Sequence, residues 1–427
     1  MEKRILDLLN KAGIEEYRIT FFTERTAELF FVKKQLDTRR IKDVAKYLVT
    51  VFRIEEKGGE KLKGAIDVMV LSSMSDDEIV KAFKDAYFAA QFALNPYYDA
   101  PKPVTAAPAF KTGRLAELAP EKAAGLMAEA LFAADNAEGA FINSAEVFIS
   151  KKTMRIVTST GTDVSWTDAK ASGEYVVQAK EPEDVEMYRQ FAYTELETEE
   201  LTRQVKEQLT FIHDRARAER ILKSGNYDLI LTGENTAEVL SFYLSRSSAY
   251  MIYPGYSRWA VGDDVQGEAA GEKMELTLRA KAPYSGEGIP MIDRKLLDKG
   301  ELKLAHGGAR FCGYLGLEPT GDYDSFSCDN AGSMSFEEMK KRPCLWAVTF
   351  SDFQMDAFSG HFGGEIRLAY LIDGEKAIPV TGGSVNGSLL EAQKDIVFST
   401  DRFKSEHYSG PYAMMLRGVA VAGTDAE

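Results

Sequence analysis

The chain has 427 residues, which is too long for one compact hydrophobic core and indicates two or three domains. Its 45% hydrophobic and 28% charged residues are typical of a soluble globular protein. The formal net charge of -14 argues against a nucleic-acid partner, and the longest apolar runs are too short to span a membrane.

The first predicted unit, residues 1–98, combines helices with antiparallel strands. An amphipathic helix opens the chain, and alternating polar and apolar residues then predict strands with a hairpin at residues 58–59. Ser75 and Glu78 have the spacing of a capping box, which predicts the start of a second helix.

A segment with three prolines, residues 97–110, is the strongest linker signal in the chain. It leads into the second predicted unit, residues 99–224. This unit begins with an alanine-rich helix that we expect to run from about Pro120 to Ala137.

Strands and a long helix complete the second unit. We expect three or four strands, with turns at residues 151–152 and at Gly161. A polar helix from about Glu195 to Lys223 follows, and the small and polar residues 224–226 predict its C-terminal cap.

The third predicted unit, residues 225–427, is rich in glycine and in short strand-like runs. Two segments in it have helical character, residues 233–248 and 388–397. The expected fold class is therefore α+β, with two units of helices packed on antiparallel strands and a β-rich C-terminal domain that is barrel-like or a sandwich.

Histidines and cysteines give no sign of a metal or cofactor site in this chain. No two of the four histidines have the spacing of ligands on one helix. The three cysteines are an odd number in a long chain, which does not resemble a disulfide framework and favours the reducing cytoplasm. These residues are His213, His306, His361, His407, Cys312, Cys328 and Cys344.

Glu234 and Glu238 are the first candidate site residues. They lie four residues apart on the helix predicted after the strand-like run at residues 227–232, so their side chains meet on one face. Such a pair can bind a hard cation or act as acid and base, but acidic residues at a helix start are also favoured by the helix dipole.

His361 is the third candidate. It follows Ser359 in a glycine-rich segment, but no acidic residue accompanies the pair in the chain order of a known catalytic triad. Two further glycine-rich segments, 262–272 and 306–316, lack the lysine of a phosphate-binding loop and are interpreted as turns.

The C-terminal third resembles a known family. Residues 285–303, 358–401 and 408–423 together are similar to the C-terminal domain of the TldD/PmbA family, whose members have been called modulators of DNA gyrase. The order of elements in the first two units, and the turn at residues 159–164, also resemble that family.

This resemblance implies a metallopeptidase-related protein. TldD-type members hold zinc with an HExxxH helix and a later cysteine, whereas PmbA/TldE-type members lack these ligands. Here the helix at Glu234 and Glu238 has neither histidine, and Ser409 is the nearest residue to the expected cysteine. The resemblance therefore implies a TldE-like subunit without zinc.

Three functional hypotheses follow. The first is a cytoplasmic heterodimer with a zinc-bearing TldD-type partner that cleaves peptides or unfolded segments in a shared cavity. The second is a homodimer that binds peptides or another ligand without hydrolysis. The third is an enzyme of another mechanism, in which Glu234, Glu238 or His361 serves as acid or base.

Overall fold

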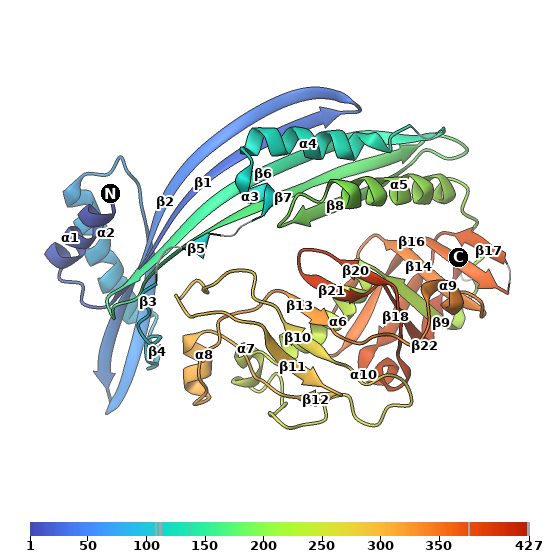
Figure 1. The fold of residues 1–427 in the computed structure, drawn as a ribbon. Coiled ribbons are helices and arrows are strands. Elements are labelled where there is room, and N and C mark those ends of the chain that lie inside the picture. The colour runs from blue at the N-terminus through green and yellow to red at the C-terminus, as the bar shows by residue number, and fades with distance from the viewer. Residues whose placement is uncertain (107–108, 111–112, 137, 375, 425–427) are drawn as a thin grey trace.

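The computed structural model describes residues 1–106, 109–110, 113–136, 138–374 and 376–424. Its strands form three sheets. A long curved sheet from the N-terminal half arches over the C-terminal half, which contains a six-stranded sheet and a closed barrel (Figure 1). None of the described helices is long and apolar enough to cross a bilayer.

The elements of both halves have the following bounds. The N-terminal half contains α1 (Glu2–Ala12), β1 (Tyr17–Val32), β2 (Gln35–Lys57), β3 (Glu60–Val70), α2 (Asp76–Ala89), η1 (Ala90–Phe92), β4 (Asn95–Pro96), β5 (Ala109–Phe110), α3 (Arg114–Glu117), α4 (Pro120–Ala133), β6 (Ala140–Thr158), β7 (Asp163–Ala179), β8 (Val185–Tyr193) and α5 (Thr198–Arg215). The C-terminal half contains β9 (Gly225–Thr232), α6 (Glu234–Arg246), α7 (Ala249–Ile252), β10 (Leu276–Leu278), β11 (Arg294–Asp298), β12 (Glu301–Leu302), α8 (Ala309–Tyr314), β13 (Phe326–Cys328), α9 (Phe336–Met339), β14 (Cys344–Phe350), β15 (Gln354–Met355), β16 (His361–Asp373), β17 (Lys376–Val380), β18 (Ser384–Ser388), α10 (Leu389–Ala392), η2 (Gln393–Asp395), β19 (Val397–Phe398), β20 (Arg402–Lys404), β21 (Tyr408–Pro411) and β22 (Ala413–Ala422).

The N-terminal sheet has the strand order β4-β3-β2-β1-β6-β7-β5, with β8 also paired to β7. Strands of both predicted N-terminal units, 1–98 and 99–224, therefore join one sheet through the β1–β6 pairing. The predicted hairpin at residues 58–59 is confirmed, because both glycines have positive φ and connect β2 to β3. The division into three domains stays a prediction.

Local capping chemistry explains where α2 begins. The Ser75 side chain accepts a hydrogen bond from the backbone N–H of Glu78, and the Glu78 carboxylate accepts one from the Ser75 N–H. The predicted capping box is thus confirmed.

In the second unit, the alanine-rich helix α4 begins at Pro120 as predicted but ends at Ala133, and Ala137 lies outside the described residues.

Two sequence predictions in the second unit are wrong. Residues 151–152 are not a turn but lie inside β6, where β1 and β7 pair on both sides and the Lys152 amine lies 4.7 Å from the centre of the Phe22 ring. The helix predicted to reach Lys223 ends at Arg215, because the chain beyond it hydrogen-bonds to β17 through Glu219.

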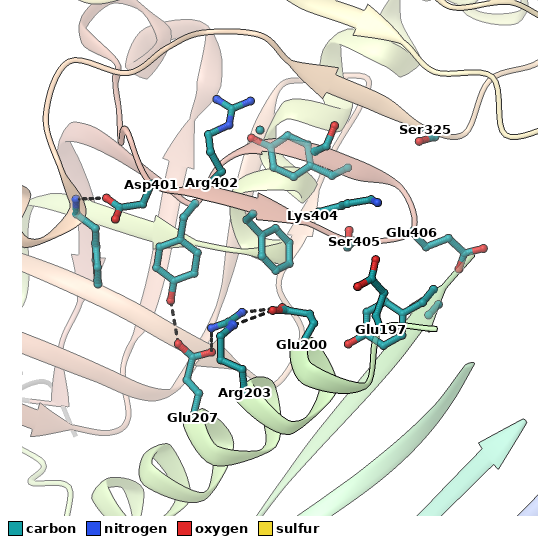
Figure 2. Close-up of a pocket in the computed structure, with 18 of the residues that line it drawn as sticks. Glu197, Glu200, Arg203, Glu207, Ser325, Asp401, Arg402, Lys404, Ser405 and Glu406 are labelled. Carbon is teal, nitrogen blue, oxygen red and sulfur yellow. Dashed lines mark hydrogen bonds and ion pairs between the residues drawn. The ribbon is translucent and has the colours of Figure 1, made fainter. Parts of the chain in front are cut away.

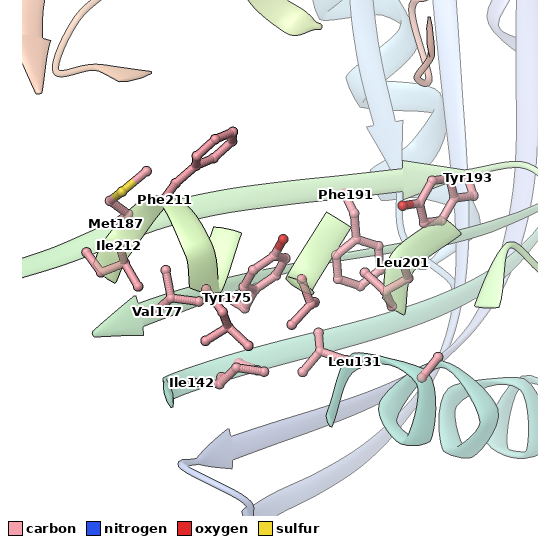
Figure 3. Packing of buried hydrophobic residues seen from close by; sticks show 14 of the residues in the cluster. Leu131, Ile142, Tyr175, Val177, Met187, Phe191, Tyr193, Leu201, Phe211 and Ile212 are labelled. Carbon is pink, nitrogen blue, oxygen red and sulfur yellow. The ribbon is translucent and has the colours of Figure 1, made fainter. Parts of the chain in front are cut away.

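Helices α4 and α5 cover one face of the N-terminal sheet and share its largest hydrophobic core (Figure 3). Tyr175 and Val177 of β7 and Phe191 of β8 point into this core together with Leu201 and Ile212 of α5. The alternation of buried and partly exposed residues along β7 follows from the two-residue period of a strand.

The C-terminal half is built on a closed ring of five strands, β14-β9-β22-β18-β16, which the β14–β16 pairing completes. Side chains of β9 alternate between two cores. Leu229 and Leu231 face a core shared with α6 and the six-stranded sheet, whereas Ile230 faces the core of α4 and α5. The predicted α+β class with a barrel-like C-terminal domain is confirmed.

Candidate functional site

The helix with the candidate glutamates, α6, starts at the end of the buried strand β9. Gly233 makes the turn between them with φ 57 and ψ -122, a backbone conformation that suits glycine. The Thr236 hydroxyl donates a hydrogen bond of 3.0 Å to the Leu231 carbonyl, which fixes the first turn of the helix. The opposite face of α6 is buried, so the helix is anchored as part of the core.

Glu234 and Glu238 contact different parts of the chain. The Glu234 carboxylate accepts a hydrogen bond of 3.3 Å from the Ser405 hydroxyl, between β20 and β21. The Glu238 carboxylate accepts one of 3.1 Å from the backbone N–H of Met355, in β15. Each glutamate therefore makes its own contact with a different segment of the chain.

His361 is exposed at the start of β16 and lines an open hollow together with Asp356. Neither Glu234 nor Glu238 lines this hollow, although Met355, which bonds to Glu238, does. His306 is buried beneath α6, where its Nε2 atom lies 2.9 Å from the Leu244 carbonyl oxygen. Burial lowers the pKa of His306, which favours the neutral imidazole.

A cavity of 1090 Å³ lies between the two halves of the molecule. One wall is α5 with the end of β8, and the other is the segment from Asp401 to Tyr412, which contains β20 and β21 (Figure 2). Glu234 faces a second cavity of 570 Å³ that shares Ser405 and Tyr193 with the first. We call these two cavities together the interlobe cleft.

An ion pair on α5 forms the floor of the cleft. Two nitrogens of the Arg203 guanidinium lie 2.8 and 2.7 Å from the oxygens of Glu200, and the hydrogen bond to Glu200 raises the pKa of Arg203. The Tyr412 hydroxyl donates a hydrogen bond of 3.2 Å to Glu207. Burial, and then the charge of Glu207, raise the pKa of Tyr412, so its phenol stays protonated.

The loop between β20 and β21 is tied to the N-terminal sheet across the cleft. The Lys170 amine of β7 lies 2.7 and 2.9 Å from the two carboxylate oxygens of Glu406. The Lys281 amine lies 3.8 Å from the same carboxylate, and His407 Nε2 lies 3.5 Å from it. We call Glu406, His407, Lys170 and Lys281 the loop anchor.

Charge pairing in the loop anchor shifts two pKa values in opposite directions. The contact with His407, followed by those with Lys170 and Lys281, lowers the pKa of Glu406 to about 2 against the opposing effect of burial. The same contact with Glu406 raises the pKa of His407 above its usual 6.5. The anchor therefore keeps a carboxylate charged at the point where the two cavities meet.

Of the residues singled out in the sequence, Glu234 and Ser409 line the cleft, His361 lines a different hollow, and most of the cleft lining was not predicted. Ser409 lies on β21 in the wall of the larger cavity. Arg203 lies far from Glu406 and Tyr412 in the chain, and no local spacing connects it to them. The one available signal was the closeness of Glu406 and His407 to Ser409 in the chain.

A zinc ion of the HExxxH type does not fit the residues at α6. Laid over this sequence, the motif places Gly233 and Glu238 at the two histidine positions. Gly233 has a positive φ that a histidine would adopt only with strain, and Glu238 is bonded to Met355. Within the described residues, no group of three or more His, Cys, Asp or Glu side chains is arranged to hold a metal.

The fold is that of a two-lobed α+β protein with a five-stranded barrel in its C-terminal half. Residues 224–423 match the family described as the PmbA/TldA metallopeptidase C-terminal domain. This match shows that residues 224–423 form a C-terminal domain of the TldD/PmbA family. No curated protein sequence matches the chain at a significant level.

Solved structures share the fold over nearly the whole length. TldE from Thermococcus kodakarensis has a TM-score of 0.75 and 15% identity, covering 98% of this chain and 100% of its own. A proposed modulator of DNA gyrase from Thermotoga maritima has a TM-score of 0.76 and 18% identity, covering 99% of both chains. A protein from Bacteroides thetaiotaomicron described in the same words has a TM-score of 0.76 and 14% identity, covering 99% of this chain and 98% of its own.

Proposed function

We propose that this chain is a TldE-like subunit without zinc in a cytoplasmic peptide-degrading or peptide-maturing complex. Its partner is a TldD-type homologue that carries the HExxxH helix and holds the zinc ion. This chain contributes walls of the space in which peptides are bound and does not perform the hydrolytic step. Nucleic acid and membrane are not among its partners in this proposal.

The observation that carries this proposal is the backbone conformation at the start of α6, together with the contacts that its two glutamates make. By the resemblance to TldD-type members, α6 corresponds to the helix that carries the HExxxH motif, and its first ligand position is then Gly233, at φ 57 and ψ -122. Both glutamates of the helix are engaged in contacts with other segments. The conformation at Gly233 and these two contacts support a structural role for α6 beside a separate catalytic subunit.

The interlobe cleft supports a role in binding. With a volume of 1090 Å³, its larger cavity exceeds the size typical of sites for small ligands and is open to chains of several residues. Its lining mixes charged side chains of both signs with aromatic rings, as at Arg203, Glu207 and Tyr412. Such a lining suits polar backbones together with varied side chains.

The test is to express the chain alone and together with the TldD-type homologue encoded in the same genome. We expect a complex on gel filtration, zinc in the complex at one ion per pair, and peptide cleavage that a chelator stops. The chain alone is expected to show neither zinc nor cleavage. Zinc-dependent cleavage by the chain alone would contradict the proposal.

The same experiment separates two other functions. If the chain forms a stable homodimer that binds peptides and ignores the homologue, the alternative of a non-catalytic homodimer is correct. If the chain alone has a metal-independent activity that is lost in Glu234→Ala, Glu238→Ala or His361→Ala, one of these residues acts as acid or base. The separate contacts of the two glutamates argue against that third function.

A further inference from the structure

The loop between β20 and β21 carries a carboxylate into the interlobe cleft. Ser405 and Glu406 line both cavities, and His407 lines the smaller one (Figure 2). The Glu406 side chain is 20% exposed, so its carboxylate is part of the cavity wall and not free in solvent. A ligand that extends from one cavity to the other therefore meets this carboxylate.

Three nitrogen-bearing side chains converge on Glu406 from separate parts of the chain. The Lys170 amine lies 2.7 and 2.9 Å from its two oxygens. Lys281, between β10 and β11, lies 3.8 Å from it, and His407 Nε2 lies 3.5 Å from it. The Nδ1 atom of His407 is 2.9 Å from the Asp324 carbonyl oxygen, which keeps Nε2 turned toward Glu406. Two ammonium groups and an imidazole are donors that suit a carboxylate.

These donors would carry unbalanced positive charge without Glu406. Among the ion pairs of the described residues, Lys170 takes part only in the one with Glu406. Lys281 has a second partner, Asp324, at 3.4 Å, but the Asp324 side chain is 70% exposed. Displacement of Glu406 would thus leave the Lys170 ammonium without a counter-charge in a partly buried place, where it attracts an anion.

Glu406 can leave the three donors without breaking the loop. Only residues 405–407 lie between the two strands. The described backbone hydrogen bonds of this loop join Ser405 to Tyr408 and His407 to Phe326, and none of them uses Glu406. Rotation about the side-chain bonds of Glu406 is therefore enough to move its carboxylate away.

We propose that Lys170, Lys281 and His407 form a carboxylate-binding site in the interlobe cleft, which Glu406 occupies until the carboxylate of a ligand displaces it. The inference rests on the proposed function, because it names a chemical group by which this chain recognises a peptide. That group is the C-terminal carboxylate or the side chain of an acidic residue. Glu406 is an internal competitor, and a tethered group competes at an effective concentration of the order of millimolar.

The surroundings favour a singly charged carboxylate over a phosphate. The lining of the smaller cavity adds two carboxylates, Glu174 and Glu234, and one guanidinium, Arg189. The Asp324 carboxylate lies 3.4 Å from Lys281 on the other side of the site. These acidic groups repel a second negative charge on the ligand.

The test uses the full chain without a partner protein or added metal. The probes are peptides of four small neutral residues, with an uncharged methoxycoumarin label at the N-terminus. One probe ends in a free carboxylate, a second ends in an amide, and a third ends in an amide but contains one aspartate. Fluorescence polarisation gives their dissociation constants, and the NMR signals of the His407 ring report whether the site is occupied.

Variants of the chain separate competition from a structural role of the loop. Glu406→Gln removes the competing charge with little change in volume, so we expect it to bind the free-acid probe about fivefold more tightly than the parent chain. Its affinity for the amide probe should stay within about twofold. Adding Lys170→Met to Glu406→Gln should reverse the gain. Glu391→Gln is the matched control for net charge, because Glu391 pairs with Lys394 at 2.6 Å and lines neither cavity.

The free-acid and amide probes are compared on one and the same variant, so the result does not depend on equal stability of the variants. Equal binding of the two probes to Glu406→Gln, no gain over the parent chain, or no binding overturns the inference. Inorganic phosphate that competes as well as acetate also overturns it, because the site is then not selective for carboxylates. The aspartate probe shows whether a chain end or a side chain supplies the group.

This experiment is separate from the test of the proposed function. It contains no TldD-type partner and no zinc, so failure to form a heterodimer would overturn the proposed function and leave a difference between the acid and amide probes standing. Equal binding of those probes would remove the carboxylate site and leave the heterodimer untouched.

Discussion

Gly233 connects β9 to α6 in a backbone conformation that favours glycine. We expect Gly233→His to lower the free energy of unfolding by roughly 1–3 kcal/mol, since a residue with a Cβ is strained at φ 57 and ψ -122. Chemical unfolding gives this number. The matched variant Glu238→His loses the bond to Met355 and is expected to cost about 1 kcal/mol.

Neither variant, nor the double variant, is expected to acquire stoichiometric zinc. The reason is that strain at Gly233 and the contact of Glu234 with Ser405 oppose the geometry that three ligands would need. Metal analysis of the purified proteins measures this. One zinc ion per chain in the double variant would show that the backbone at Gly233 adapts easily.

The three cysteines are buried, and burial raises their pKa values, to about 11 for Cys312 and Cys344 and to about 12 for Cys328. Because the thiolate is the reactive form, we expect the folded protein to react slowly with a thiol reagent at pH 8. Unfolding in guanidinium should release three fast thiols per chain. A fast thiol in the folded state would contradict the described burial.

At the scale of elements, the loop between β20 and β21 depends on pH through its anchor. The raised pKa of His407 means that the charged imidazolium stabilises the anchor fully below pH 6.5. This contribution is lost as the pH rises through the raised value. Glu406 contributes fully above its ordinary pKa of 4.5, and this contribution is lost as the pH falls toward its lowered pKa of about 2.

Glu406→Gln tests this coupling. Removing the carboxylate removes the main cause of the shift, so the pKa of His407 should fall in the variant, as measured by NMR titration of its ring. Hydrogen exchange of residues 404–408 should become faster at pH 6 in the variant than in the parent chain. Lys299→Gln, far from the anchor, is the control. An unchanged His407 titration would contradict the assigned cause.

Local elements were predictable where one short segment determines them. The hairpin at residues 58–59 and the cap at Ser75 follow from glycine and from side-chain hydrogen bonds within four residues. The end of α5 was mispredicted because Glu219, beyond it, pairs with β17, some 160 residues later. Long-range pairing overrode the local cap signal.

The candidate site was predictable only in part for the same reason. The position of α6 after a buried strand, and the absence of its histidines, were visible in the sequence. The cleft was not, because α5 and the β20–β21 segment meet only in the folded chain. Tyr412 and Glu207 pair across it without any periodic pattern that links them.

At the scale of the whole molecule, one hydrophobic core joins the two halves. Ile230 of β9, Tyr370 of β16 and Met415 of β22 face out of the barrel and pack in the same core as α4 and α5. The Phe211 ring of α5 lies 5.8 Å from that of Trp346 and 6.5 Å from that of Tyr370. The barrel thus needs the N-terminal half to cover this apolar wall.

A fragment of residues 224–427 is therefore expected to self-associate, although it contains the whole matched family domain. The exposed wall should bind a hydrophobic dye and cause self-association, because an apolar patch of this kind has no cover. Sedimentation and dye fluorescence measure this, with the full chain as control. A monomeric fragment without dye binding would show that the shared core is dispensable.

The turn at Gly233 also bears on how readily this sequence could change to the HExxxH pattern. A single change to histidine meets a backbone that has settled into a glycine-only shape, so the first step back is penalised before any ligand is gained. The second step, at Glu238, breaks a contact that now holds β15. Each single change toward the HExxxH pattern is therefore expected to lower the stability of the chain before a metal ligand is complete.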